Sequence, residues 1–124
     1  MSRVAVVTGG TRGIGEAICL ALKKAGYKVA AVYGGDEAKA KAFTQETGIP
    51  AYKIDVSDFN QVKAGIAKIT ADLGPVEVVV NNAGITRDGT LHKMTPEQWE
   101  AVIHTNLSSC FNMCRSVIDS MRER

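Results

Sequence analysis

The sequence predicts an α/β fold in which a parallel sheet carries helices on both faces. Short apolar runs alternate along the chain with longer segments whose apolar residues recur at helical spacing. Strands that alternate with helices build parallel sheets through crossover connections. The runs are apolar almost throughout, which is typical of strands covered on both faces. The chain has 124 residues, 45% of them apolar, which is enough for one modest domain with a core.

The first half of the chain predicts two strands and two helices. A strand at residues 4–7 is followed by glycines and then by a helix at 14–25, where apolar side chains recur every three or four positions. A second strand at 29–33 stops at two glycines. Asp36 is a suitable N-cap for a second helix, which runs to about Gly48.

The second half continues the alternation. A weaker third strand is predicted at 51–54, and Asp58, with Gln61 three residues later, predicts the start of a third helix. Residues 76–80 form the fourth strand, after a Gly-Pro break. Two helical stretches then finish the chain, one on each side of Asn106. We expect the doubly wound strand order 3-2-1-4.

A glycine-rich segment, TGGTRGIG at residues 8–15, joins the first strand to the first helix. Glycines at such a turn allow a tight bend, close backbone approach to a phosphate, and close packing of the helix on the strand. The free N–H groups at the start of the helix favour an anion. The spacing is GxxxGxG, and no Gly-Lys-Ser/Thr of a P-loop follows. We therefore predict a Rossmann-like dinucleotide site, with a purely structural turn as the alternative.

The end of the second strand bears on which dinucleotide binds. An acidic residue there would bond the ribose hydroxyls of NAD and repel a 2′-phosphate. This chain has Tyr33 followed by two glycines, and Asp36 is better explained as a helix cap. Arg12 can make a charge-assisted contact with a 2′-phosphate. These residues favour NADPH, and a solvated surface arginine is the alternative interpretation of Arg12.

Three segments together resemble one family, the short-chain dehydrogenases/reductases. They are the glycine loop at 8–15, NNAG at 81–84 directly after the fourth strand, and Asn106. They occur in the family's order along the whole chain. Within the family, residues 81–88 resemble the 3-ketoacyl thioester reductases. Residues 92–99 and 106–112 look closest to the acetoacetyl-CoA reductases.

The resemblance implies NADPH-dependent reduction of a CoA-linked acyl thioester, acetoacetyl-CoA, to (R)-3-hydroxybutyryl-CoA for polyhydroxyalkanoate synthesis. The 3-oxoacyl-(acyl-carrier-protein) reductases of fatty-acid synthesis are the alternative.

The resemblance also implies roles for individual residues. Asp55 would hold the adenine amino group, and the stretch 82–84 would pass beside the adenosine ribose. Asn106, the catalytic residue it implies, would interrupt a helix so that its backbone carbonyl holds a water of the proton relay. An ordinary helix junction is the alternative for Asn106. The expected cofactor-binding residues are Gly9, Thr11, Arg12, Gly13, Ile14, Gly15, Tyr33, Asp55, Val56, Asn82, Ala83 and Gly84.

The family's chemistry also implies a tyrosine, a lysine four residues later and a serine, all beyond a fifth strand. The chain has no YxxxK, because four residues after Tyr27, Tyr33 and Tyr52 come Ala31, Glu37 and Val56. The valine-rich fourth strand would also be an exposed sheet edge. We expect residues 1–124 to be a partial NAD(P)-binding Rossmann domain that lacks the catalytic half and is inactive alone. A non-catalytic dinucleotide-binding or self-associating fragment is the alternative of another class.

The last helix carries an apolar stripe that should pack on the sheet. The stripe consists of Leu107, Phe111, Cys114, Val117, Ile118 and Met121. The resemblance suggests that this helix also pairs with its copy. We expect a homo-oligomer through that helix or through the edge of the fourth strand.

Composition argues against several other classes of function. The net charge is +2 and no basic run stands out, which argues against a nucleic-acid partner. No signal peptide and no membrane-spanning apolar run is present. Three cysteines without CxxC spacing suit a cytoplasmic protein. His92 and His104 are too few for a metal site.

Overall fold

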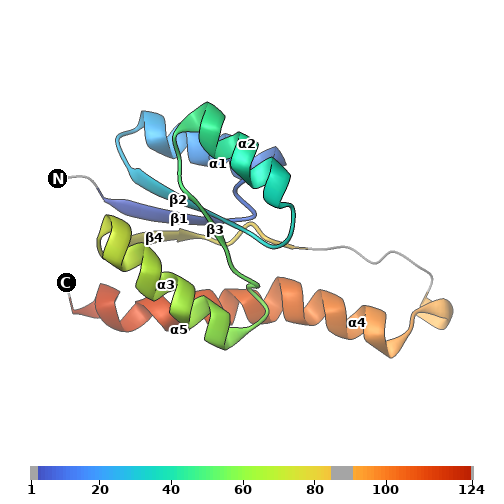
Figure 1. The fold of residues 1–124 in the computed structure, drawn as a ribbon. Helices are drawn as coiled ribbons and strands as arrows, with labels where there is room; N and C mark the ends of the chain where they lie inside the picture. Colours follow the sequence, from blue (N-terminus) through green and yellow to red (C-terminus); the bar gives the residue numbers. More distant parts are fainter. Residues whose placement is uncertain (1–2, 85–90, 124) are drawn as a thin grey trace.

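The computed structural model describes residues 3–84 and 91–123, and in this part of the chain four parallel strands form one sheet (Figure 1). The strands are β1 Val4–Thr8, β2 Lys28–Tyr33, β3 Ala51–Lys53 and β4 Val76–Val80. Their order is β3-β2-β1-β4, so the predicted doubly wound order is confirmed. The register pairs Val6 of β1 with Ala30 of β2 on one side and with Val79 of β4 on the other.

The helices follow the strands in the predicted order. They are α1 Gly13–Lys24, α2 Glu37–Thr47, α3 Phe59–Leu73, α4 Pro96–Val102 and α5 Ser109–Arg122. A 3₁₀ turn at Leu91–Lys93 precedes α4, and a π-helical segment at Ile103–Ser108 joins α4 to α5. The side chains of Asp36, Asp58 and Thr95 cap α2, α3 and α4 as their sequence positions predict.

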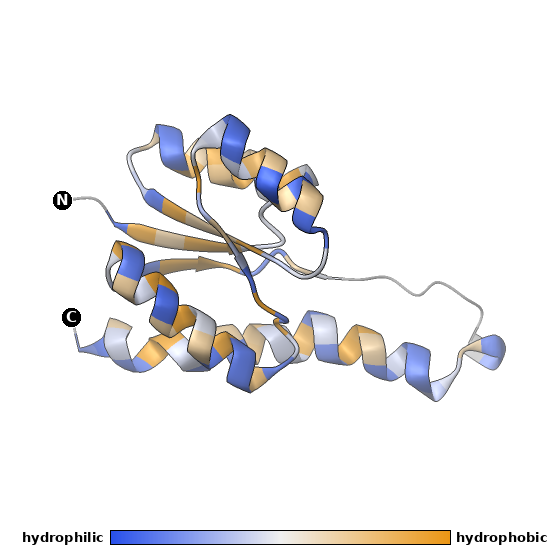
Figure 2. Ribbon diagram, viewed as in Figure 1, coloured by the Kyte–Doolittle hydropathy of each residue, from blue (hydrophilic) through white to orange (hydrophobic). Residues whose placement is uncertain are grey.

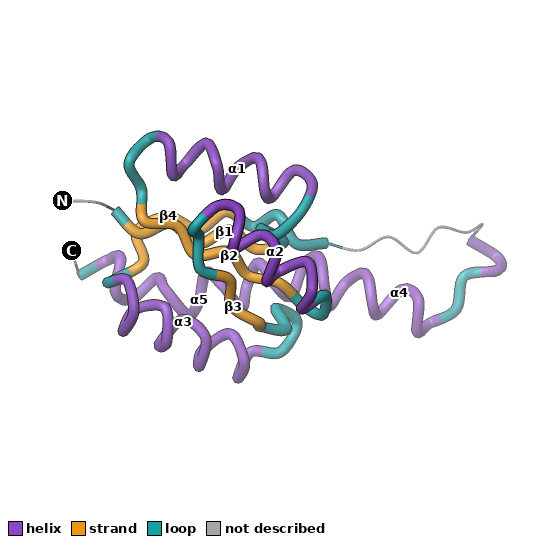
Figure 3. The backbone as a smooth tube through the Cα atoms, turned by 45° about the horizontal axis from the view of Figure 1, so that its top comes forward, coloured by secondary structure: helices purple, strands orange, loops and turns teal. Residues whose placement is uncertain are grey.

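Helices cover both faces of the sheet, and Figures 1 and 3 show α1 and α2 on one face and α3 and α5 on the other. Because successive side chains of a strand point to opposite faces, β1 supplies both cores. Val7 joins Cys19 and Phe43 under α1 and α2. Val6 joins Ile69 and Met113 against α3 and α5. Figure 2 shows the apolar residues concentrated in the strands between these layers.

The last helix corrects one prediction. The predicted stripe does not pack on the sheet as a unit, because Leu107, Phe111 and Ile118 are 64%, 62% and 41% exposed. Of the predicted stripe, Val117 is buried and Met121 packs at the edge of the core.

The buried face of α5 is instead built from the residues Ser109, Asn112, Met113 and Val117. Ser109 and Asn112 are polar, and each has a hydrogen bond inside the protein. Apolar periodicity could not identify this face, because hydrogen-bonded polar side chains pack in a core without an apolar signature. Among the described residues, no helix has both the length and the apolar character that crossing a membrane requires.

Candidate functional site

A hollow of about 800 Å³ lies at the carboxyl ends of the strands. It is bordered by the loop between β1 and α1, the end of β2, the turn after β3, and the segment after β4. In open α/β sheets this crevice, where the strand order reverses, is the usual place for a ligand. Its volume is in the range of about 300–1,000 Å³ that is common for small-molecule sites.

The glycine loop brings the backbone against the start of α1. Gly13 has φ +56°, in the left-handed region that favours glycine. A Cβ on Gly15 would meet the carbonyl carbon of Gly9 at 2.7 Å, so the helix start packs directly on the loop. Arg12, at the N-cap, gives no side-chain hydrogen bond to the first turn of α1. The first N–H groups of α1 therefore lack the side-chain cap that α2, α3 and α4 have.

The segment after β4 is fastened to the glycine loop. The Thr8 Oγ1 atom accepts hydrogen bonds of 2.9 Å from the backbone N–H groups of both Asn82 and Ala83. The Asn82 side chain donates through Nδ2 to the carbonyl oxygen of Gly9 at 3.2 Å. Thr8 is 2% exposed, so the acceptor of the first two bonds is buried. The NNAG segment at 81–84 is thus held against the glycine loop.

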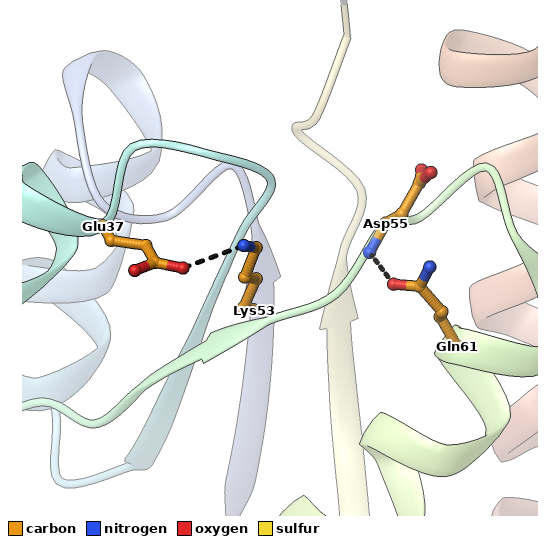
Figure 4. Close-up of polar contacts among 4 residues, drawn as sticks. All are labelled: Glu37, Lys53, Asp55 and Gln61. Atoms are coloured by element: carbon orange, nitrogen blue, oxygen red, sulfur yellow. Dashed lines mark hydrogen bonds and ion pairs between the residues drawn. The ribbon is translucent and has the colours of Figure 1, made fainter.

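The turn after β3 presents one carboxylate to the hollow. Asp55 Oδ1 accepts hydrogen bonds from the N–H and the hydroxyl of Ser57, at 3.0 and 2.6 Å. The Asp55 N–H donates to Gln61 Oε1 at 3.0 Å, and Figure 4 shows the carboxylate directed away from Gln61. Among the described residues, neither Asp55 Oδ2 nor the Val56 N–H has a hydrogen-bond partner. The turn therefore offers an acceptor and a donor side by side.

Gln61 departs from its expected role in a helix cap. Asp58 Oδ1 accepts from the N–H groups of Asn60 and Gln61, as a cap does. The Gln61 side chain, however, accepts its hydrogen bond from the Asp55 N–H and not from the Asp58 N–H of a capping box. Its nitrogen lies 3.4 Å from Asp58 Oδ2. The helix start and the Asp55 turn are therefore one hydrogen-bonded unit.

Charged residues from the start of α1 and of α2 also line the hollow. Arg12, Lys39 and Asp36 all line it, and Asp36 Oδ1 is engaged by the Lys39 N–H at 2.9 Å. Beside them, Glu37 and Lys53 form an exposed ion pair of 2.8 Å (Figure 4). The hydrogen bond and positive charge of Lys53 lower the pKa of the Glu37 carboxyl, and the same bond raises the pKa of Lys53. The pair therefore leaves little net charge beside the hollow.

The structure brings most of the expected cofactor-binding residues together in one place. They all line the hollow except Gly15, which lies beneath the loop and packs on Gly9. The prediction missed several lining residues, namely Val32, Gly34, Gly35, Asp36, Lys39, Ile54 and Thr105. Lys39 could have been found from its place in the first turn of a helix that starts at this edge. Residues 85–88 of the resembling segment lie outside the described residues.

Asn106 does not line the hollow, although its neighbour Thr105 does. It lies in the π-helical segment, and a Cβ on Gly84 would stand 3.1 Å from Asn106 Oδ1. The Asn106 carbonyl faces the Ser109 hydroxyl and the Cys110 thiol, at 3.5 and 3.4 Å. π-Helical turns are rare and frequently occur at functional sites. The helix around Asn106 is therefore π-helical between two α-helical segments.

No three His, Cys, Asp or Glu side chains gather into a metal-binding group within residues 3–84 and 91–123. The three cysteines are unpaired, and Cys19 is buried beneath the glycine loop. A Cβ on Gly10 would meet Cys19 Sγ at 3.0 Å. Burial raises the pKa of the Cys19 thiol to about 11, with a smaller effect from Glu16. Cys19 is therefore a packing residue under the site.

Comparison with known proteins gives the family. The model of the short chain dehydrogenase family matches residues 3–124. The chain belongs to the short-chain dehydrogenase family. A solved structure of this family, a double phenylalanine-to-leucine mutant of a Serratia marcescens short-chain dehydrogenase/reductase, superposes with a TM-score of 0.90 at 27% identity. That match covers 96% of this chain and 51% of the Serratia chain.

Two curated relatives of this chain have the names of two different reductases. The acetoacetyl-CoA reductase of Rhizobium meliloti is 64% identical over the whole of this chain, which covers 52% of that protein. The 3-oxoacyl-(acyl-carrier-protein) reductase of Staphylococcus aureus strain Mu50 is 41% identical over 98% of this chain and 51% of that protein. The chain thus spans about half the length of the curated relatives it matches. Both relatives are named as reductases.

Proposed function

We propose that the hollow binds NADPH and that the chain serves a reductase acting on a 3-ketoacyl thioester. The observation that carries the proposal is the pairing of two features at one hollow. One is the start of α1, whose first N–H groups have no side-chain cap, and the other is the donor and acceptor of the Asp55–Val56 turn. Together they match the diphosphate and the adenine base of an adenine dinucleotide.

The diphosphate of NADPH fits the glycine loop. A helix N-terminus carries a partial positive charge and free N–H groups, which favour a phosphate. The close packing of Gly15 on Gly9 brings the loop backbone against the start of α1. A phosphate there would supply the acceptors that no cap residue supplies.

The adenine end fits the turn after β3. Adenine donates from its N6 amino group and accepts at the adjacent N1. Asp55 Oδ2 can accept from the amino group, and the Val56 N–H can donate to N1. The roles of Asn82, Ala83 and Gly84 beside the adenosine ribose are part of the same proposal. It is supported by their place in the lining of the hollow and by the bond from Asn82 to the Gly9 carbonyl.

The phosphorylated cofactor is preferred over NADH in this proposal. Arg12 and Lys39 both line the hollow and can pair with a 2′-phosphate. Asp36, which also lines the hollow, is engaged in capping α2. No acid follows Tyr33 directly, since Gly34 and Gly35 come next. Bound NADPH would supply the hydride for reduction of the substrate carbonyl.

The substrate we propose is acetoacetyl-CoA, reduced to (R)-3-hydroxybutyryl-CoA for polyhydroxyalkanoate synthesis. The support is the 64% identity to the acetoacetyl-CoA reductase of Rhizobium meliloti. A carrier-protein-linked 3-oxoacyl substrate is the second candidate, supported by the Staphylococcus relative. Asn106 is proposed to hold a water through its backbone carbonyl, supported by the π-helical turn around it.

These 124 residues contain no YxxxK sequence, so we propose that they bind cofactor without reducing the substrate alone. In the same proposal they form one partial NAD(P)-binding domain. We also propose that the chain self-associates through α5, whose exposed Leu107, Phe111 and Ile118 favour contact with another copy. The three unpaired cysteines support a place in the cytoplasm.

Titration of the chain with NADPH and with NADH, followed by cofactor fluorescence, tests this function. We expect binding of both with tighter binding of NADPH. No binding of either dinucleotide would remove the proposal, and equal binding would remove the preference for the phosphorylated form. Addition of acetoacetyl-CoA to the NADPH complex should leave NADPH absorbance unchanged. Rapid oxidation of NADPH would contradict the proposed need for further residues.

A further inference from the structure

Asn112 is a buried polar residue that does not itself line the hollow. It lies on the buried face of α5 and is 6% exposed. Its Nδ2 atom donates a 2.9 Å hydrogen bond to the carbonyl oxygen of Val56, a residue 56 positions earlier in the chain. The side chains next to it on α5, Met113 and Val117, belong to the apolar core. An amide among such neighbours is tolerated because its hydrogen bond is made.

The bond from Asn112 fixes one particular peptide unit. The peptide bond is planar, so the carbonyl of Val56 and the N–H of Ser57 point in opposite directions from one rigid group. Asn112 holds the carbonyl side of this group. The N–H side donates to Asp55 Oδ1 at 3.0 Å. A donor on α5 thus sets the orientation of the bond that holds the Asp55 carboxylate.

The two preceding peptide units, Asp55–Val56 and Ile54–Asp55, are held from the start of α3. The carbonyl of Asp55 accepts from the Asp58 N–H at 3.0 Å, and the Asp55 N–H donates to Gln61 at 3.0 Å, the contact drawn in Figure 4. Within the described residues, these contacts leave Asp55 Oδ2 and the Val56 N–H as the open groups of the turn. The turn is therefore fixed from two helices, and Asp55 and Val56 both line the hollow.

We propose that Asn112 is a positioning residue for recognition of the adenine base. It acts through the Val56–Ser57 peptide, which orients the Asp55 carboxylate toward the amino group of the base. This inference rests on the proposed function of the hollow. It assigns to the buried face of α5 a part in base selectivity, in addition to its packing against the sheet.

The experiment compares NADPH with its deamino analogue, in which hypoxanthine replaces adenine. The analogue lacks the amino group that Asp55 would accept from. We expect the chain to prefer NADPH. Asn112→Leu keeps a side chain of similar size but removes the donor, and the preference should fall about 2- to 10-fold, the effect of one hydrogen bond. Affinity for the analogue should change less. Ser116→Ala is the matched control, because it removes a 2.7 Å bond to the Asn112 carbonyl on the same helix.

The outcomes separate positioning from packing. If Asn112→Leu weakens both nucleotides equally and keeps the preference, Asn112 is a packing residue and the proposal is overturned. If Asn112→Leu does not fold, Asn112→Ser is read in the same way, because serine is too short to reach Val56. Failure of both variants to fold would also overturn the proposal, by assigning Asn112 to the core alone.

The same measurements keep this proposal distinct from the proposed function. A wild-type chain that binds neither nucleotide would refute the proposed function, and the role of Asn112 with it. A wild-type chain that prefers NADPH, with an Asn112→Leu variant that keeps the full preference, would refute only the role of Asn112.

Discussion

Gly15 lies so close to Gly9 that a Cβ built on Gly15 would stand 1.9 Å from the Gly9 carbonyl oxygen. The obstructing atom belongs to the backbone, so the loop itself must move to admit any side chain. Gly15→Ala should therefore destabilise the fold by about 1–3 kcal/mol, the range seen for overpacking. It should also weaken binding of NADPH, because the loop moves away from the start of α1. Urea denaturation and cofactor titration measure the two effects.

The control for that change is Gly34→Ala. A Cβ on Gly34 meets no atom within 4 Å, and its φ is outside the left-handed region. Its effect on unfolding should stay within about 1 kcal/mol. A Gly15→Ala variant as stable as the Gly34→Ala variant would show that the loop is not packed as described.

The positive side chains that line the hollow lead to a second prediction, on the preference for NADPH over NADH. Arg12→Ala and Lys39→Ala should each lower affinity for NADPH by about 3- to 10-fold, as loss of one charge-assisted bond does. Affinity for NADH should hardly change, because NADH has no 2′-phosphate. Lys24→Ala, at the far end of α1, is the matched control for loss of one positive charge. Equal losses for the two cofactors would assign these side chains to general attraction of anions.

Much of the fold could be predicted because local signals agree with one another. Asp36 and Gly48 mark the ends of α2 by chemistry that acts within a few residues, and the structure has Asp36 as the N-cap and Gly48 as the C-cap. The alternation of strands and helices predicted a parallel sheet, and the doubly wound pattern gave the expected strand order. The third strand ends at Lys53, one residue earlier than predicted.

Features that depend on distant contacts could not be predicted in this way. The bond from Asn112 to Val56 joins two segments whose proximity no local pattern reveals. Gln61 was expected in a helix cap, but its side chain serves the turn before the helix. The exposure of Phe111 has the same origin, because the phase of α5 is set by polar residues that find partners only in the folded protein.

A third prediction concerns the thiols and pH. Burial raises the pKa of Cys19 from the usual 9.0 to about 11, so the folded state favours the neutral thiol. The stability that this contributes is fully present below pH 9 and is lost as the pH rises through about 11. At pH 8, a thiol reagent should label Cys110 and Cys114 in the native chain and leave Cys19 unlabelled. Unfolding in urea should release the third site, whereas rapid native labelling of Cys19 would contradict its burial.

The exposed side of α5 gives the fourth prediction. Phe111 is 62% exposed, and its ring lies 6.4 Å from that of Phe59, which is 39% exposed. An apolar surface of this kind is stabilised by contact with a second copy. Phe111→Ser should weaken self-association, with little loss of monomer stability because the ring is mostly in water. Sedimentation velocity over a concentration series measures the effect.

Leu20→Ser provides a matched control for the interface, because Leu20 is 44% exposed on α1, which covers the opposite face of the sheet. If α5 forms the contact, only Phe111→Ser lowers the associated fraction. Equal effects of the two substitutions would indicate nonspecific attraction between apolar surfaces. A wild-type chain that stays monomeric at every concentration would exclude association through α5. In that case the exposed edge of β4 would lose its predicted role as well, because either contact would raise the mass of the particle.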